Sequence, residues 1–150
     1  MKAIMQPGKQ LPRADHCYCF TVRKTARQIS RFYDAHLQPT GLRITQFLIL
    51  AMLDEVSSAA MLELADRLDI EPTAIGKMVR ILEREGLVSI RRSLTDARSR
   101  IVELTGKGHL LFDQAAPLWQ EAQRRIAGTI WGGKIDALRS GFTISEARTR

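Results

Sequence analysis

Cysteine is scarce in this sequence, and long apolar runs are missing. The two cysteines, Cys17 and Cys19, are too close together to cross-link a fold of 150 residues, and their scarcity favours a reducing compartment. The longest uncharged and mostly apolar run, 44–53, is about half as long as a bilayer span requires. We therefore expect a cytoplasmic protein that makes no membrane contact.

Sequence motifs of common enzyme classes are missing too. The chain has no Gly-x-Ser-x-Gly, no phosphate-binding loop, no His-Glu-x-x-His and no dinucleotide fingerprint. Its histidines, His16, His36 and His109, are far apart, and Cys17 and Cys19 would point to different sides of a helix. We therefore expect no metal and no other cofactor. An enzyme with an unrecognised site is the weakest interpretation.

Positive charge, in contrast, is abundant and unevenly distributed. The formal net charge is +7 and the isoelectric point is about 10.0, which favours a polyanionic partner. Segment 77–107 holds eight Lys or Arg against four acidic residues, a local charge of +4, whereas segment 42–70 holds two Arg and five acidic residues. Nucleic acid is therefore the leading class of partner.

Apolar periodicity predicts three helices in the first half of the chain. One runs from Asp15 to Leu37 and ends before Pro39, and the next, around 47–53, is apolar on all sides and begins at a Thr45 cap. Ser57 or Ser58 is expected to cap a short third helix with one buried face. Residues 1–13 show no such periodicity and are interpreted as a flexible arm.

A fourth helix is predicted between Pro72 and Gly86, because proline favours a first helical position and glycine a left-handed cap. Its apolar residues form one face: Ile75, Met78, Val79 and Leu82. The opposite face is small and then basic: Thr73, Ala74, Gly76, Lys77, Arg80 and Arg84. Such a face suits the major groove, with Thr73, Lys77 and Arg80 contacting bases or phosphates. An ordinary amphipathic surface helix would explain the spacing equally well.

A β-hairpin with a charged tip follows, with strands at 87–92 and 100–104. Arg98 is predicted to enter the minor groove while Asp96 holds its side chain, and Arg100 is a further tip residue. Arg91 and Arg92 are expected nearer the phosphates. A solvated charge run is the alternative, but the order of helix, helix and basic hairpin favours a helix-turn-helix with a DNA-binding wing.

Thr105 is expected to cap a long helix that runs to about Ile130, followed by an amphipathic segment around 135–138. Much of this apolar surface lies outside the compact middle of the chain, so a second copy is expected to cover it. We therefore predict a mainly α fold with a small β-wing. Segments 14–40 and 105–150 form the helical dimerisation region, and segment 41–104 forms the winged helix-turn-helix.

Several motifs resemble those of the MarR family of winged helix-turn-helix regulators. Segment 96–100, Asp-Ala-Arg-Ser-Arg, is similar to the family's wing motif with one position contracted between Ser99 and Arg100, and further matches lie at 63–65, 82–88 and 104–108. The resemblance implies a homodimeric repressor that reads a roughly palindromic operator and is released by a small aromatic ligand or an oxidant. A winged helix that docks on a protein instead of DNA is the alternative.

The resemblance extends to a branch of the family that senses organic hydroperoxides through a cysteine. Cys19-Phe20 is similar to that cysteine position and Tyr33 to one tyrosine partner, whereas Arg23 and Ile44 replace two other tyrosines. Arg23, one helical turn from Cys19, would favour the reactive thiolate. Cys19 and Tyr33 are therefore a candidate redox sensor, and plain packing of a small helical side chain is the preferred alternative.

Overall fold

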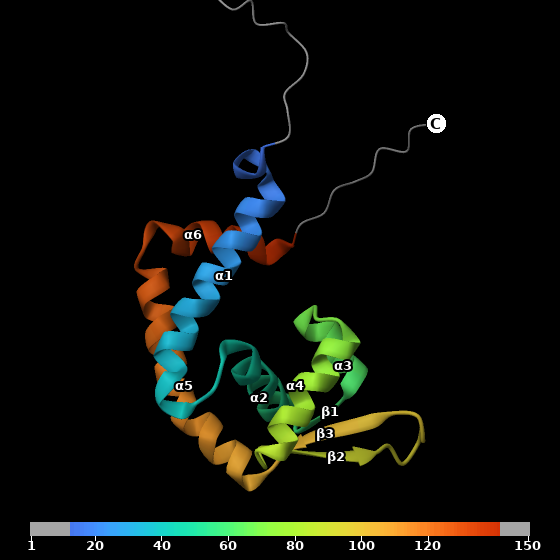
Figure 1. Ribbon diagram of the computed structural model, residues 1–150. Helices are drawn as coiled ribbons and strands as arrows, with labels where there is room; N and C mark the ends of the chain where they lie inside the picture. The colour runs from blue at the N-terminus through green and yellow to red at the C-terminus, as the bar shows by residue number, and fades with distance from the viewer. Residues whose placement is uncertain (1–12, 142–150) are drawn as a thin grey trace, which may run out of the picture.

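The computed structural model describes residues 13–141, and in this range the chain is mostly helical with one small sheet (Figure 1). The predicted fold class is confirmed. The elements in chain order are η1 (Ala14–His16), α1 (Tyr18–Leu37), η2 (Gln38–Thr40), α2 (Ile44–Val56), β1 (Ser58–Ala60), α3 (Met61–Leu68), α4 (Pro72–Arg84), β2 (Val88–Arg92), β3 (Arg100–Leu104), α5 (Gly106–Ala127), α6 (Ile130–Asp136) and η3 (Ala137–Ser140). The predicted arm lies outside the described residues, except for Arg13.

The hydrophobic core is centred on α2, as its all-round apolar sequence predicts. Ile49, Leu50 and Leu53 are fully buried, and they form one cluster with side chains of α3, α4 and the sheet. Phe47 stacks on Phe112 and Trp119 of α5, with ring centroids 5.5 and 5.8 Å apart. This aromatic stack joins the helix-turn-helix to the long C-terminal helix.

Two helix caps differ from the sequence prediction. Helix α2 begins at Ile44 rather than after Thr45: Gln46 Oε1 accepts from the Arg43 amide at 2.9 Å, and Asp34 Oδ1 accepts from the Ile44 amide at 2.8 Å. The Thr45 cap was therefore wrong, because residues on both sides of it satisfy the free amides. The Ser57 or Ser58 cap was also wrong, since α3 begins after Ala60 and without a side-chain cap.

Ser58 belongs instead to an unpredicted third strand, and Ser57 is the C-cap residue that ends α2. Strand β1 pairs antiparallel with β3, Ala59 opposite Val102, so the sheet has the order β1-β3-β2. A strand of three small residues carries no readable alternation, and its pairing depends on a partner more than 40 residues away. The predicted hairpin is confirmed, with Val88 opposite Leu104 and Arg92 opposite Arg100.

The C-terminal part forms a long helix and a separate second segment, as predicted, but the long helix ends slightly earlier than expected. The Thr105 cap is confirmed, because its hydroxyl accepts from the Gly108 amide at 3.0 Å. Helix α5 ends at Ala127, and Thr129 caps the separate helix α6. Helices α1 and α5 pack along each other, away from the sheet (Figure 1). Within residues 13–141, no helix is long and apolar enough to span a membrane.

Candidate nucleic-acid interface

Helix α4 presents its two sides as the sequence predicts. Ile75, Val79 and Leu82 are fully buried, and the Glu85-Gly86 turn ends the helix with Gly86 at φ +74°. Thr73, Lys77 and Arg80 are exposed on the other side, and Ala74 is half-buried. Neither Lys77 nor Arg80 forms an ion pair with another described residue. Their charges therefore face solvent and are open to an anionic partner.

The wing tip is organised by short polar side chains. Ser93 Oγ accepts from the Asp96 amide at 3.3 Å, and the Ser93 amide donates to the Ser99 carbonyl at 3.0 Å. Asp96 Oδ1 accepts from the backbone amide of Arg98 at 3.0 Å. Asp96 thus fixes the backbone at Arg98, whereas the sequence analysis expected it to hold the side chain. Arg98 is exposed at the tip.

Arg91 and Arg92 lie on opposite faces of the wing because strand side chains alternate. Arg91 donates to Glu103 Oε1 from Nε at 2.9 Å and from Nη2 at 2.6 Å, which occupies much of its guanidinium. This ion pair was not predicted from the sequence, since it depends on the strand register. Arg92 is exposed and lies directly opposite Arg100 in the register of the two strands. Nη1 of Arg100 donates to the Ala97 carbonyl at 3.3 Å.

The predicted groove-binding residues therefore come from two adjacent elements. Helix α4 packs against β2, so its basic side adjoins the wing, and the helix and the wing lie next to each other in Figure 1. A hollow of about 330 Å³ between them is bordered by Arg80, Arg92 and Arg100. A helix with a basic outer face beside an arginine-rich wing is the arrangement that grips neighbouring grooves of a duplex.

Comparisons with known proteins agree with this geometry. The MarR family model matches residues 42–99. The Mycobacterium tuberculosis transcriptional regulator MosR, solved in complex with DNA, is 35% identical, with 84% of this chain and 94% of that chain covered and a TM-score of 0.73. The chain belongs to the MarR family.

Two curated relatives are themselves regulators. An HTH-type transcriptional repressor of Mycobacterium bovis is 32% identical over 61% of this chain and 66% of its own length. The organic hydroperoxide resistance transcriptional regulator of Bacillus subtilis is 27% identical over 76% of this chain and 72% of its own length. As a MarR-family member the chain is a transcriptional regulator, and this favours the DNA-binding interpretation over a protein-docking winged helix.

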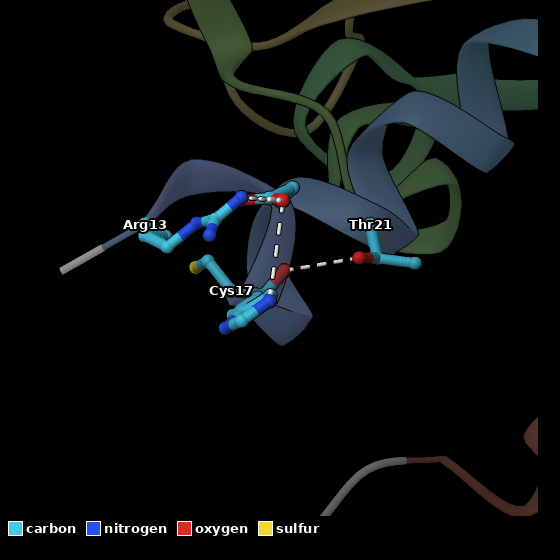
Figure 2. A network of polar contacts seen from close by, with 5 residues as sticks. Arg13, Cys17 and Thr21 are labelled. Atoms are coloured by element: carbon cyan, nitrogen blue, oxygen red, sulfur yellow. Dashed lines mark hydrogen bonds and ion pairs between the residues drawn. The ribbon is translucent and has the colours of Figure 1, made fainter. Parts of the chain in front are cut away.

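The two cysteines of this MarR-family chain lie at the start of α1, and both are exposed. Cys17 precedes the helix, and its carbonyl accepts from the hydroxyl of Thr21 at 3.1 Å (Figure 2). The same carbonyl accepts from the Thr21 amide at 3.0 Å. Cys19 lies in the first turn. Since it is exposed, it does not pack in the core of its own chain, which weakens the packing interpretation.

Tyr33 lies on the same helix, 14 residues after Cys19, a rise of about 21 Å. The two side chains therefore cannot meet within one chain. Tyr33 is buried, and its hydroxyl donates to Gln123 Oε1 of α5. Burial raises the pKa of Tyr33 above its ordinary value, and the Arg139 charge lowers it by less. A sensor made of Cys19 and Tyr33 would need a second copy of the chain.

One candidate site that the sequence analysis missed is a cavity of about 530 Å³ between α1, α5 and α6. Phe32 and Trp131 contribute aromatic walls, and Arg125 is the charged lining residue. The Arg125 guanidinium lies 5.7 Å from the Phe32 ring centroid and donates to Nε2 of His36 at 3.2 Å. The residues that line the cavity come from distant parts of the chain, so no local sequence pattern indicates the cavity.

Proposed function

We propose that this MarR-family regulator binds a roughly palindromic duplex operator as a two-fold homodimer and represses transcription until a ligand or an oxidant releases it. The observation that carries the proposal is the exposed basic side of α4 beside the arginine-bearing wing. Thr73, Ala74 and Lys77 enter the major groove, Arg80 contacts bases or phosphate at its edge, and Arg98 enters the minor groove on a tip shaped by Asp96. Arg92 and Arg100 contact phosphate, and Arg91 contributes less because Glu103 binds it.

The activity belongs in the cytoplasm, where a bacterial-type operator would be accessible, and it involves no catalytic turnover. The dimer forms through segments 14–40 and 105–150, whose described part leaves Phe20, Val22, Ile130, Trp131 and Leu138 exposed. A two-fold dimer carries two recognition helices, which is why the operator is palindromic.

The experiment that tests DNA binding is a fluorescence-anisotropy titration against DNA fragments recovered by a genome-scale pull-down. Arg98→Ala should weaken binding by about 1 to 3 kcal/mol, because a groove contact is lost. Arg124→Ala removes the same charge from an exposed part of α5 and is the control. Equal affinity of wild type and Arg98→Ala at fixed salt rejects the groove contact. A flat salt dependence of wild-type binding would favour a protein-docking module instead.

Peroxide sensing is a second candidate function, supported by the exposure of both cysteines and by the hydroperoxide-resistance relative. An organic hydroperoxide should release the wild type from DNA, and Cys19→Ser should abolish this response while leaving affinity unchanged. Cys17→Ser is the matched control. Release that persists in Cys19→Ser rejects Cys19 as the sensor.

The aromatic cavity supports the alternative signal, a small aromatic ligand. Its walls are formed by α1, α5 and α6, the helices assigned to dimerisation, so an occupant would change the geometry of the dimer. Arg125 favours an anionic ligand. Salicylate should quench the tryptophan fluorescence of the wild type more strongly than that of Arg125→Gln. Arg124→Gln is the control and should be quenched like the wild type. Equal quenching of all three proteins rejects the site.

A further inference from the structure

The hollow between α4 and the wing gathers arginines from three elements. Arg80 of α4, Arg92 of β2 and Arg100 of β3 all border it. Arg91 also reaches its edge, but its guanidinium is bound to Glu103 on the other face of the strand. Among the described residues the bordering carboxylate is Glu83 alone, so the hollow carries an excess of positive charge.

The strand register brings two of these charges directly together. Arg92 and Arg100 are Cα partners in the ladder, and directly opposed side chains lie on the same face of a hairpin. Ile90, two residues before Arg92, also borders the hollow, which places this face toward α4. Opposed like charges destabilise a hairpin. In the free protein the arrangement therefore costs stability that an anion in the hollow would recover.

We propose that Arg80, Arg92 and Arg100 form a clamp for a single phosphate of the DNA backbone. The proposal rests on the proposed function: when α4 occupies the major groove and the wing tip the adjacent minor groove, the sugar-phosphate ridge that separates the grooves passes between them. The hollow lies at this place. Guanidinium groups suit a phosphate there, because each presents several donors in a planar fork.

The clamp also gives Arg100 a role that differs from that of Arg98. Arg98 lies at the exposed tip, whereas Arg100 is the first residue of β3 and is half-buried. In the contracted wing motif the second arginine therefore belongs to the strand and faces the hollow. It contacts the ridge between the grooves and does not enter the minor groove.

The experiment measures affinity for a mixed-sequence duplex, since a phosphate contact acts on all sequences alike. Arg80→Gln and Arg92→Gln should each weaken binding about tenfold or more. Because the two residues share one phosphate, the double variant should lose less than the product of the two single effects. Arg124→Gln, which removes an equal charge from α5, is the control.

Two further measurements complete the test. The triple variant, with Gln at 80, 92 and 100, should lower the slope of log affinity against log salt by about 0.9 per subunit, one phosphate's worth. Arg92→Gln should unfold thermally at the wild-type temperature or above it, because a repulsion is removed.

Multiplicative losses in the double variant, a slope change near three phosphates or a lower unfolding temperature of Arg92→Gln would each overturn the clamp. Such results would leave the proposed function intact, provided that the wild type binds with a steep salt dependence. A wild type that binds no duplex overturns the proposed function and the clamp together.

Discussion

At the scale of single residues, Asp96 acts on the backbone of its wing. Its carboxylate accepts from the Arg98 amide at 3.0 Å. Asp96→Ala should loosen the tip and weaken DNA binding by about 1 kcal/mol, the value of one such hydrogen bond. Asp96→Asn should retain wild-type affinity in an anisotropy titration, because the amide oxygen still accepts. If Asn is as damaging as Ala, Asp96 acts through its charge and the backbone role is wrong.

Tyr33 makes the stability of the protein sensitive to alkaline pH. Because burial raises its pKa in the folded state, the folded chain keeps this proton to a higher pH than the unfolded chain. The stabilisation is present below the unfolded pKa and is lost as pH rises through the folded value. In urea titrations the free energy of unfolding should fall less in Tyr33→Phe than in wild type between about pH 9 and pH 11. Tyr18→Phe, at an exposed tyrosine, should follow the wild type.

At the scale of elements, the start of α5 packs directly on the turn that follows α4. A Cβ on Gly108 would lie 2.0 Å from the Leu87 carbonyl oxygen, whereas a Cβ on Gly106 meets nothing within 4 Å. Gly108→Ala should therefore destabilise the fold by about 2 kcal/mol, measured as a lower urea midpoint. Gly106→Ala should leave the midpoint unchanged or raise it. Similar midpoints for the two variants would contradict the close packing.

The elements that the sequence could predict are those defined by local sequence patterns. Both faces of α4, its Pro72 start and the strands of the hairpin follow from local periodicity and turn chemistry, and the structure has them all. Strand β1, the Arg91–Glu103 ion pair and the hollow between α4 and the wing depend on residues distant in sequence. No local pattern encodes such contacts. The long helix predicted to about Ile130 ends already at Ala127, because Gly128 and Thr129 end it and Thr129 caps α6.

At the scale of the whole molecule, apolar side chains on the C-terminal elements are exposed, and we propose that a second copy of the chain covers them. Ile130 and Leu138 are 77% and 67% exposed. The double substitution Ile130→Asp and Leu138→Asp should convert a dimer into a monomer in analytical ultracentrifugation, because it places charges in an apolar interface. Leu62→Asp introduces a charge at a position 64% exposed on α3 and should leave the dimer intact. A double variant that remains dimeric would place the interface elsewhere.

The junction between α4 and α5 has a consequence for operator geometry. Thr105 Oγ1 donates to the Gly86 carbonyl at 2.6 Å, and Lys107 Nζ donates to the Glu85 carbonyl at 2.7 Å. The end of α4 is thus fixed to the start of α5, a helix of the proposed dimerisation region. In a symmetric dimer, a small change in the angle between the two copies of α5 would alter the distance between the two α4 helices. That distance must match operator half-sites about 34 Å apart for both subunits to bind. A ligand or oxidant that acts on the dimerisation region can therefore release the operator without contacting any residue proposed to bind the bases.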